Sequence, residues 1–254
     1  MKLIIEIASL GSVYCLETFY PLFKDRAGRL PHGARNLSMG LVNAAVTQLF
    51  FAGLIASAAL WTEDNRFGIL RPLGLPGILQ TILLILLFDG WMYLWHRANH
   101  ETPFLWRFHR THHSDLELDC TSALRFHAGE ICLSHLARLL VIPLLGVGFS
   151  ELMLYEIFLQ PVIIFHHSNV DFPEKWDRLI RTVIVSPNLH RVHHSKEVLD
   201  TNSNYSSIFS FWDRLWKTLR EKENPGSVTY GLPDFREEEW QTVPGMLRTP
   251  FGSK

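Results

Sequence analysis

Two near-identical hexapeptides, HRTHHS (His109–Ser114) and HRVHHS (His190–Ser195), are the segments of this chain best suited to bind a metal ion. In each, the first histidine is followed by others three and four positions later. Residues at this spacing share one face of a helix. His96 and His100 form a third pair with the i, i+4 spacing. Each motif can therefore present two or three imidazoles to one point, which predicts two equivalent ligand arms.

The other histidines favour the same interpretation, since only His32 and His135 of the 13 lie outside the clusters. Ten imidazoles exceed the four that saturate a structural zinc ion, and they divide into about five for each of two ions, each with an open position. Imidazole suits zinc, copper, iron and nickel, so spacing alone does not name the metal. The predicted metal ligands are His96, His100, His109, His112, His113, His127, His167, His190, His193 and His194.

Long apolar segments must position these histidines, and their lengths of roughly 20 residues fit membrane helices. The expected fold is all-α: a polytopic membrane helix bundle with about four to five spans. Residues 1–74 are expected to form N-terminal membrane helices, and residues 75–254 a catalytic domain. The alternative is a set of helices buried in a large soluble core. The apolar segments are Leu3–Phe23, Leu37–Trp61, Leu75–Trp95, and a helical hairpin formed by Ile131–Val147 and Leu152–Phe165.

Basic residues predict the orientation of the bundle. Lys24, Arg26, Arg29 and Arg35 lie between the first two apolar segments, with Asp25 as the only acidic residue there. The positive-inside rule places this loop in the cytoplasm. The hairpin leaves and returns on that side, so residues 168–254 should form a compact cytoplasmic cap. The formal net charge of −1 gives no indication of a nucleic-acid partner.

The hairpin has two further consequences. It should bring its two ends together, and His127 and His167 are therefore expected to be neighbours. Its first arm carries His135 and Arg138. Polar and ionisable residues inside a membrane helix usually face protein or a water-filled cavity, so this arm should face protein rather than lipid.

Four residues are predicted to support the ligands without binding metal. Asp89 precedes His96 by seven residues, two helical turns, and a carboxylate inside a span is usually functional. We expect it to accept a hydrogen bond from a ligand imidazole, or, as the alternative, to make a polar contact between helices. Glu130, His166 and Asn188 are the other candidates. The tetrapeptide WDRL occurs twice, at Trp176 and Trp212, and is interpreted as cap packing with an Arg–Asp surface pair.

With these motifs in view, the chain resembles the fatty acid hydroxylase and sterol desaturase superfamily of membrane di-iron oxygenases. The histidine boxes HRANH, HRTHH and HRVHH carry the resemblance, together with DGWMYLWHR, FHHSNVDFP, PNLHRVHHS and FWDRLWKTL. It runs from about Leu79 to Phe251. One departure is Ala128, where many members have proline after the histidine, and His166 is an additional histidine at a position where relatives often carry another polar residue.

The resemblance implies that the ten histidines bind two iron ions (Fe²⁺/Fe³⁺) and that O₂ is a co-substrate. It implies hydroxylation or desaturation of an unactivated C–H bond in a lipid or sterol-like substrate. The metal set would be the catalytic set, with no further catalytic side chain. Electrons would come from a separate ferredoxin or cytochrome-type donor with its reductase, since the sequence shows no GxGxxG, P-loop or CxxCH motif. The short chain and the lack of a fused electron carrier favour a bacterial inner membrane.

Two other function classes remain open from the sequence. A zinc-dependent membrane lipid hydrolase could use a similar histidine cage and would need no O₂. A metal transporter or sensor would place its ligands at mid-membrane on broken helices, whereas these histidines lie at the ends of spans. An inactive relative is a third possibility, which the full set of ten histidines disfavours.

Overall fold

The computed structural model describes residues 2–24, 26 and 28–252, and this part of the chain is helical apart from loops and isolated β-bridges. The described segments include four that are long and apolar enough to cross a membrane. The all-α polytopic prediction is therefore confirmed. The four segments are Arg29–Asp64, Gly77–Glu101, Ala128–Leu145 and Phe149–His166.

The first two predicted spans differ from the structure. The expected span Leu3–Phe23 becomes α1 (Lys2–Phe19), which is not among the four because it carries Lys2, Glu6 and Glu17. The second span begins at Arg29, inside the predicted loop. Here α2 (Arg29–Val46), a π-helical turn (Thr47–Phe51) and α3 (Ala52–Asp64) form one continuous helix. Its polar first turns are tolerated because His32 and Asn36 bond to Asp115.

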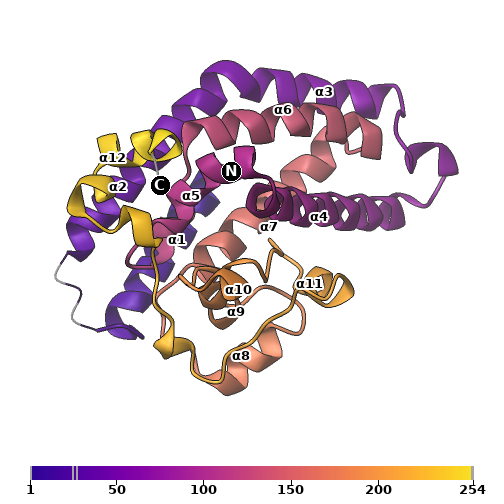
Figure 1. Ribbon diagram of the computed structural model, residues 1–254. Helices are drawn as coiled ribbons and strands as arrows, with labels where there is room; N and C mark the ends of the chain where they lie inside the picture. Colours follow the sequence, from indigo (N-terminus) through magenta and orange to yellow (C-terminus); the bar gives the residue numbers. More distant parts are fainter. Residues whose placement is uncertain (1, 25, 27, 253–254) are drawn as a thin grey trace.

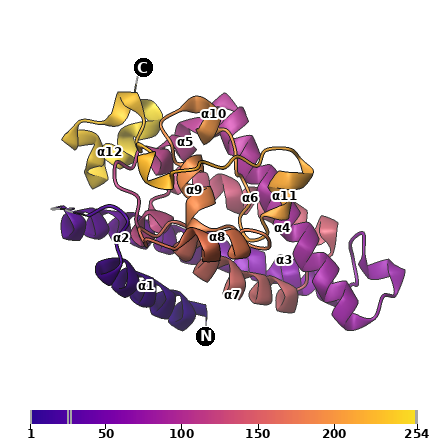
Figure 2. The ribbon, with the colours of Figure 1, turned by 90° about the horizontal axis from the view of Figure 1, so that it is seen from below.

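Figures 1 and 2 show the long helices together, with the short helices of the cap gathered on one side of them. Helix α1 packs along α7 (Phe149–His166), and α3 runs beside α6 (Ala128–Leu145). Helix α5 (Pro103–His113) turns back from the end of α4 (Gly77–Glu101), and α12 lies beside α2. The cap is compact, as predicted. It contains α8 (Glu174–Ile180), α9 (Pro187–His193), α10 (Val198–Thr201), α11 (Phe211–Leu215) and α12 (Val243–Arg248).

Local sequence explains where the two helices with the HxxHH motif begin. Proline is favoured in the first helical turn, where its missing N–H removes no helical bond. Pro103 starts α5, and Pro187 starts α9. Ser186 caps α9, because its hydroxyl oxygen accepts a hydrogen bond from the backbone N–H of Leu189. The first residue of each short helix is therefore fixed, and this sets the directions in which its histidines point.

The hairpin prediction holds for the connection but not for the packing. Helix α6 (Ala128–Leu145) ends at Gly146, whose left-handed φ of 92° suits glycine, and α7 (Phe149–His166) follows after a short turn. From that turn α6 and α7 diverge, and a cavity lies between them. Because the arms diverge, their far ends do not meet.

Candidate metal centre

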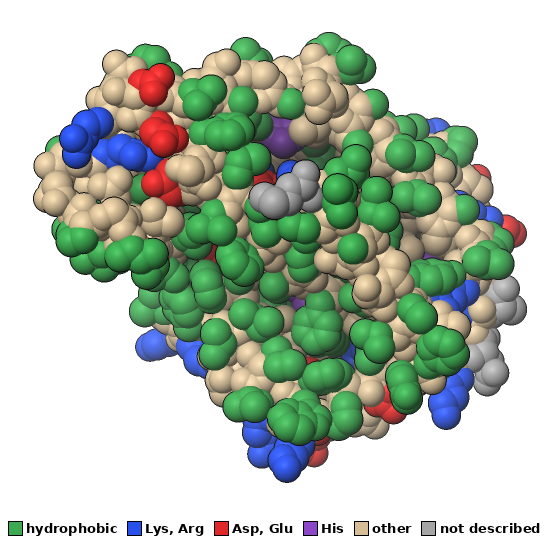
Figure 3. All heavy atoms as spheres, turned by 180° about the vertical axis from the view of Figure 1, so that it is seen from behind, with side chains coloured by type: hydrophobic (Ala, Val, Ile, Leu, Met, Phe, Trp, Pro, Cys, Tyr) green, Lys and Arg blue, Asp and Glu red, His purple; other side chains and the backbone are tan. Residues whose placement is uncertain are grey.

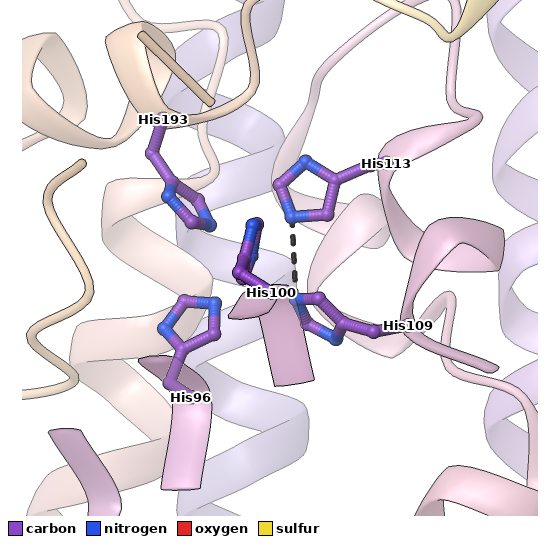
Figure 4. A group of neighbouring side chains, drawn as sticks. All are labelled: His96, His100, His109, His113 and His193. Carbon is purple, nitrogen blue, oxygen red and sulfur yellow. Dashed lines mark hydrogen bonds between the residues drawn. The ribbon is translucent and has the colours of Figure 1, made fainter. Parts of the chain in front are cut away.

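Nine of the ten predicted ligands gather in two sets. Within each set, the possible ligand atoms all lie within 4.8 Å of one another. Figure 4 shows that the side chains of the first set point toward one centre from α4, α5 and α9. The first histidine group is His96, His100, His109, His113 and His193. The second histidine group is His112, His167, His190 and His194. The two groups adjoin, because the rings of His113 and His194 stack with centroids 4.5 Å apart.

The structure corrects the expectation that each HxxHH motif serves one point. Residues i and i+4 of a helix lie about 40° apart around the axis, whereas i+3 and i+4 lie about 100° apart. In α5, His109 and His113 therefore enter the first group and His112 enters the second. In α9, the first and third histidines enter the second group, and His193 enters the first. The motif of α5 thus gives two histidines to the first group and one to the second, and the motif of α9 gives one to the first and two to the second. Each motif therefore links both groups.

Hydrogen bonds fix the ring orientation of four of these histidines. The Nδ1 atom of His96 donates to the carbonyl of Tyr205 at 2.8 Å, and Nδ1 of His193 donates to the carbonyl of Ser203 at 2.6 Å. Nδ1 of His167 donates to the Ile163 carbonyl at 2.7 Å. Nδ1 of His109 likewise bonds to Oε1 of Glu130 at 2.8 Å. A neutral imidazole that donates through Nδ1 has its lone pair on Nε2, which is the usual arrangement for a metal ligand.

The Nε2 atoms approach one another at distances that suit a shared ion. His109 and His113 are 3.2 Å apart between Nε2 atoms, and the His112–His167 and His167–His190 pairs are at 3.1 and 3.0 Å. Two imidazoles bound to one ion at about 2.1 Å place their nitrogens roughly 3.0–3.4 Å apart. Nε2 of His167 carries no proton, so it directs a lone pair toward Nε2 of His112 and of His190, and an ion between these atoms could be bound by all three. The residues present therefore fit a metal ion.

Burial keeps these rings in the form that binds metal. Desolvation lowers the pKa of His193 to about 3 and that of His167 to about 4. It also holds the pKa of His112, His113 and His190 well below the ordinary value. Neutral imidazoles offer lone pairs at neutral pH without having to lose a proton first.

Of the residues predicted to support the ligands, Glu130 contacts a histidine as expected and Asp89 does not. Glu130 does contact a predicted ligand, through the bond from His109. Asp89, which is fully buried, does not bond to an imidazole. Its carboxylate accepts four hydrogen bonds: from the Tyr155 hydroxyl, the backbone N–H groups of Ile208 and Phe209, and the indole of Trp212. The reason is that the cap loop (residues 203–210) contacts both Asp89 and His96. The carboxylate therefore bonds to the loop instead of to the imidazole ring.

A second carboxylate, on α11 and not predicted from the sequence, bonds to the same loop. Asp213 accepts hydrogen bonds from the backbone N–H groups of Tyr205 and Ser206 and from the Thr218 hydroxyl. Asp89 and Asp213 together fix the loop whose carbonyls orient His96 and His193. The expected surface pair in WDRL is therefore wrong, since Asp213 is buried. The repeated WDRL motif was the feature of the sequence that could have predicted this role. In both copies the aspartate is buried and accepts hydrogen bonds from a neighbouring segment.

The first WDRL copy also accounts for Asn188. Asp177 is buried and accepts hydrogen bonds from Arg181, the Ser186 hydroxyl and the Asn188 backbone N–H. The Asn188 side chain accepts from Arg191 and donates to Glu174. It therefore orders the start of α9, and no bond to a histidine ring is formed. The predicted support of a ligand by Asn188 is not borne out.

His127 is the one predicted ligand that joins neither group. Its Nε2 donates to the Leu247 carbonyl at 3.1 Å, and its Nδ1 accepts from the Gly129 N–H, so it caps α6. The expected His127–His167 contact does not form, because α6 and α7 diverge. His166 lies closer to the site: its ring centroid is 4.0 Å from that of His190, and its buried Nδ1 has no partner among the described residues.

A cavity of about 570 Å³ extends from the histidines between α2, α3, α6 and α7. Six histidines of the site region line one end of it: His96, His109, His112, His166, His167 and His190. His135 and Arg138 also face the cavity, so that the first arm of the hairpin faces inward as predicted. Figure 3 shows a broad apolar surface on this side of the molecule, interrupted by a hollow in which a histidine is visible.

A membrane-type helical bundle that buries two adjoining histidine groups at one end of a largely apolar cavity defines the class of protein: a membrane protein with a histidine site that could hold metal beside an apolar cavity. The sequence profile of the fatty acid hydroxylase family matches residues 81–218, more than half of the chain. The chain belongs to the fatty acid hydroxylase family.

Its curated relatives are lipid and sterol hydroxylases or monooxygenases. The ornithine lipid hydroxylase of Rhizobium tropici is 29% identical over 62% of this chain and 46% of its own length. The human alkylglycerol monooxygenase is 25% identical over 81% of this chain and 44% of its own. The mouse cholesterol 25-hydroxylase is 28% identical over 63% and 54%. The chain thus spans about half the length of these relatives. No solved structure matches it.

Proposed function

We propose that this protein is a membrane di-iron oxygenase that hydroxylates, or desaturates, an unactivated C–H position of a lipid or sterol-like substrate. The observation that carries the proposal is the convergence of imidazole nitrogens in two adjoining histidine groups at the end of a largely apolar cavity. Family membership supports the same reaction class, because the named relatives act on an ornithine lipid, alkylglycerols and cholesterol.

Iron, when bound, would supply the O₂ chemistry that no side chain can perform. The first histidine group would hold one ion and the second group the other. Glu130 keeps His109 in the metal-binding tautomer, and the carbonyls of Ser203 and Tyr205 do the same for two further ligands. The apolar walls of the cavity exclude water and hold a hydrocarbon segment beside the site. Holding the reacting carbon in place contributes to rate by removing rotational and translational freedom.

The second histidine group has four members, which leaves room for one more ligand. We propose His166 as this ligand in preference to His127, because the ring of His166 is next to that of His190. His166→Ala should then lower the metal content of the purified protein, whereas His127→Ala should lower its thermal stability and leave the metal content unchanged. The opposite pattern would restore His127 to the ligand set.

The site would face the cytoplasm and receive electrons from a separate ferredoxin or cytochrome-type protein and its reductase, docked on the cap. Charge supports this orientation: Arg26 pairs with Glu117, and Arg35 with Glu238, so the basic segment lies on the cap side. A reporter protein fused after residue 252 should lie on the cytoplasmic side of the membrane, and its activity should show that location. Activity on the opposite side would reverse the orientation.

The deciding experiment is the metal content of the detergent-purified protein, made anaerobically with iron supplied. Wild type should contain about two irons per chain. His193→Ala in the first group and His112→Ala in the second should each lose one or both ions, and both should abolish O₂-dependent oxidation of lipid while membrane insertion is retained. Leu136→Ala, on the exposed side of α6, is the matched control.

Two results would contradict the proposal. Activity retained in both histidine variants would remove the metal site from the reaction. Zinc that iron does not displace, together with release of fatty acid or phosphate from lipid esters without O₂, would establish a zinc-dependent lipid hydrolase instead.

A further inference from the structure

The cavity has a polar stripe on the wall formed by α2 and α6, which begins near the second histidine group, where Asn43 donates to the carbonyl of Phe126, and continues along α6 to Arg138. Ser134, His135 and Arg138 face the cavity from α6, and Asn43 and Thr47 face it from α2 and the π-helical turn. The Thr47 hydroxyl and Nε2 of His135 are 2.9 Å apart, which joins the two sides. Polar side chains within membrane helices are costly and mark sites of function. The stripe therefore needs an explanation besides packing.

Three buried atoms of the stripe have no hydrogen-bond partner among the described residues: Nε of Arg138, Nδ1 of His135 and Oδ1 of Asn43. Nε of Arg138 is a donor, and Oδ1 of Asn43 is an acceptor. Nδ1 of His135 takes either role, according to how Nε2 bonds to Thr47. Buried polar atoms are normally hydrogen-bonded, because leaving one unpaired costs about 1–3 kcal/mol. The stripe thus holds both an unpaired donor and an unpaired acceptor at the cavity wall.

The charges beside the stripe are already paired with one another. Arg138 bonds to Glu156 at 2.6 Å, and Lys2 bonds to the other oxygen of the same carboxylate at 2.8 Å. Glu6 lines the same part of the cavity, so the four formal charges of this region sum to zero. An added anion or cation would give this region a net charge, which is costly to bury. A neutral group that both donates and accepts is the best match, and a hydroxyl is the simplest such group.

Helix geometry relates the Arg138 end of the stripe to Glu130, the carboxylate beside the first histidine group. Glu130 bonds to His109 of the first group, and Arg138 lies eight residues further along the same helix. At 1.5 Å per residue this is about 12 Å along the axis. We propose that the stripe binds a hydroxyl of the lipid substrate, which is a neutral amphiphile. The inference rests on the proposed function and names the substrate class of the same site.

Binding of three probes that share one hydrocarbon chain tests the inference: 1-hexadecanol, its methyl ether and hexadecanoate. Native mass spectrometry of the purified full chain, without reductant so that no turnover occurs, gives their affinities. Wild type should bind the alcohol about five- to tenfold more tightly than the ether, which cannot donate, and more tightly than the anion. His135→Phe and Asn43→Leu should each reduce the preference over the ether to less than about twofold. Leu140→Ala, on the exposed face of α6, should retain it.

Several results would overturn the inference. Equal binding of alcohol and ether by wild type would show that no hydroxyl is recognised, and tighter binding of hexadecanoate would show that the site selects an anion. Full preference in both polar-to-apolar variants, with melting temperatures like that of wild type, would exclude the stripe. Binding is measured without turnover, so that the metal and oxidation experiments can fail independently of it.

Discussion

Replacing Asp89 by asparagine tests whether the cap loop positions the metal ligands. One carboxylate oxygen accepts from Tyr155 and Ile208, and the other accepts from Phe209 and Trp212. In asparagine, one of these oxygens becomes an NH₂ group that faces two donors. Two hydrogen bonds to a charged acceptor are lost, at about 2 kcal/mol each, so the docked loop should be destabilised by about 4 kcal/mol.

The consequence should reach the metal through the loop carbonyls that orient His96 and His193. Loss of an outer partner typically lowers metal affinity by about 10- to 100-fold. We therefore expect Asp89→Asn to have a lower melting temperature, faster amide hydrogen exchange in residues 203–213 and less bound metal at limiting iron. Glu101→Gln is the control, because Glu101 is on the same helix, exposed, and paired with Arg97. Unchanged exchange and unchanged metal content in Asp89→Asn would refute the reasoning.

Three further changes have defined outcomes. Glu130→Ala removes the bond that fixes the tautomer of His109, so iron affinity in the first histidine group should fall about 10- to 100-fold in an equilibrium titration, and wild-type affinity would contradict this role. Gly90→Ala would place a Cβ 2.8 Å from the Trp212 ring, so it should destabilise cap docking and be non-additive with Asp89→Asn in thermal melts; simple additivity would argue against a shared loop. Burial, reinforced by nearby carboxylates, raises the pKa of the Cys120 thiol well above its ordinary value. Maleimide labelling of Cys120 at pH 8.5, followed by mass spectrometry, should therefore be slow in the native protein and fast in denaturant. Equal rates would show an accessible thiolate.

The sequence predicted which residues form the site better than how they are shared. HxxHH spacing and span ends identified nine of the histidines in the two groups, because both are local features. The division of each motif between two groups depends on helix phase relative to other helices, which a single motif does not carry. His127 was misplaced for a related reason. A short connection predicts packed arms, but α6 and α7 diverge around a cavity.

The residues that orient the ligands could be predicted only in part. Glu130 was visible, because it follows a histidine on a short motif. Tyr205 and Ser203 act through backbone carbonyls, which any residue type supplies, so their sequence carries no signal. The role of Asp89 depended on which segment of a distant cap reached it, and 123 residues separate it from Trp212. Long-range contacts of this kind are fixed by tertiary packing and not by local pattern.

The opposed ligand sharing between α5 and α9 has a consequence for the order in which the protein matures. His96 meets its carbonyl partner 109 residues later in the chain, and α9 contributes to both histidine groups. Neither group is complete until the last third of the chain has been synthesised and folded against the bundle, and contacts of such sequence separation form slowly. Under the proposed function, metal loading would therefore be a late step of biogenesis. A nascent chain with only its membrane helices inserted holds partial sets of imidazoles, and both groups are completed together when α9 docks.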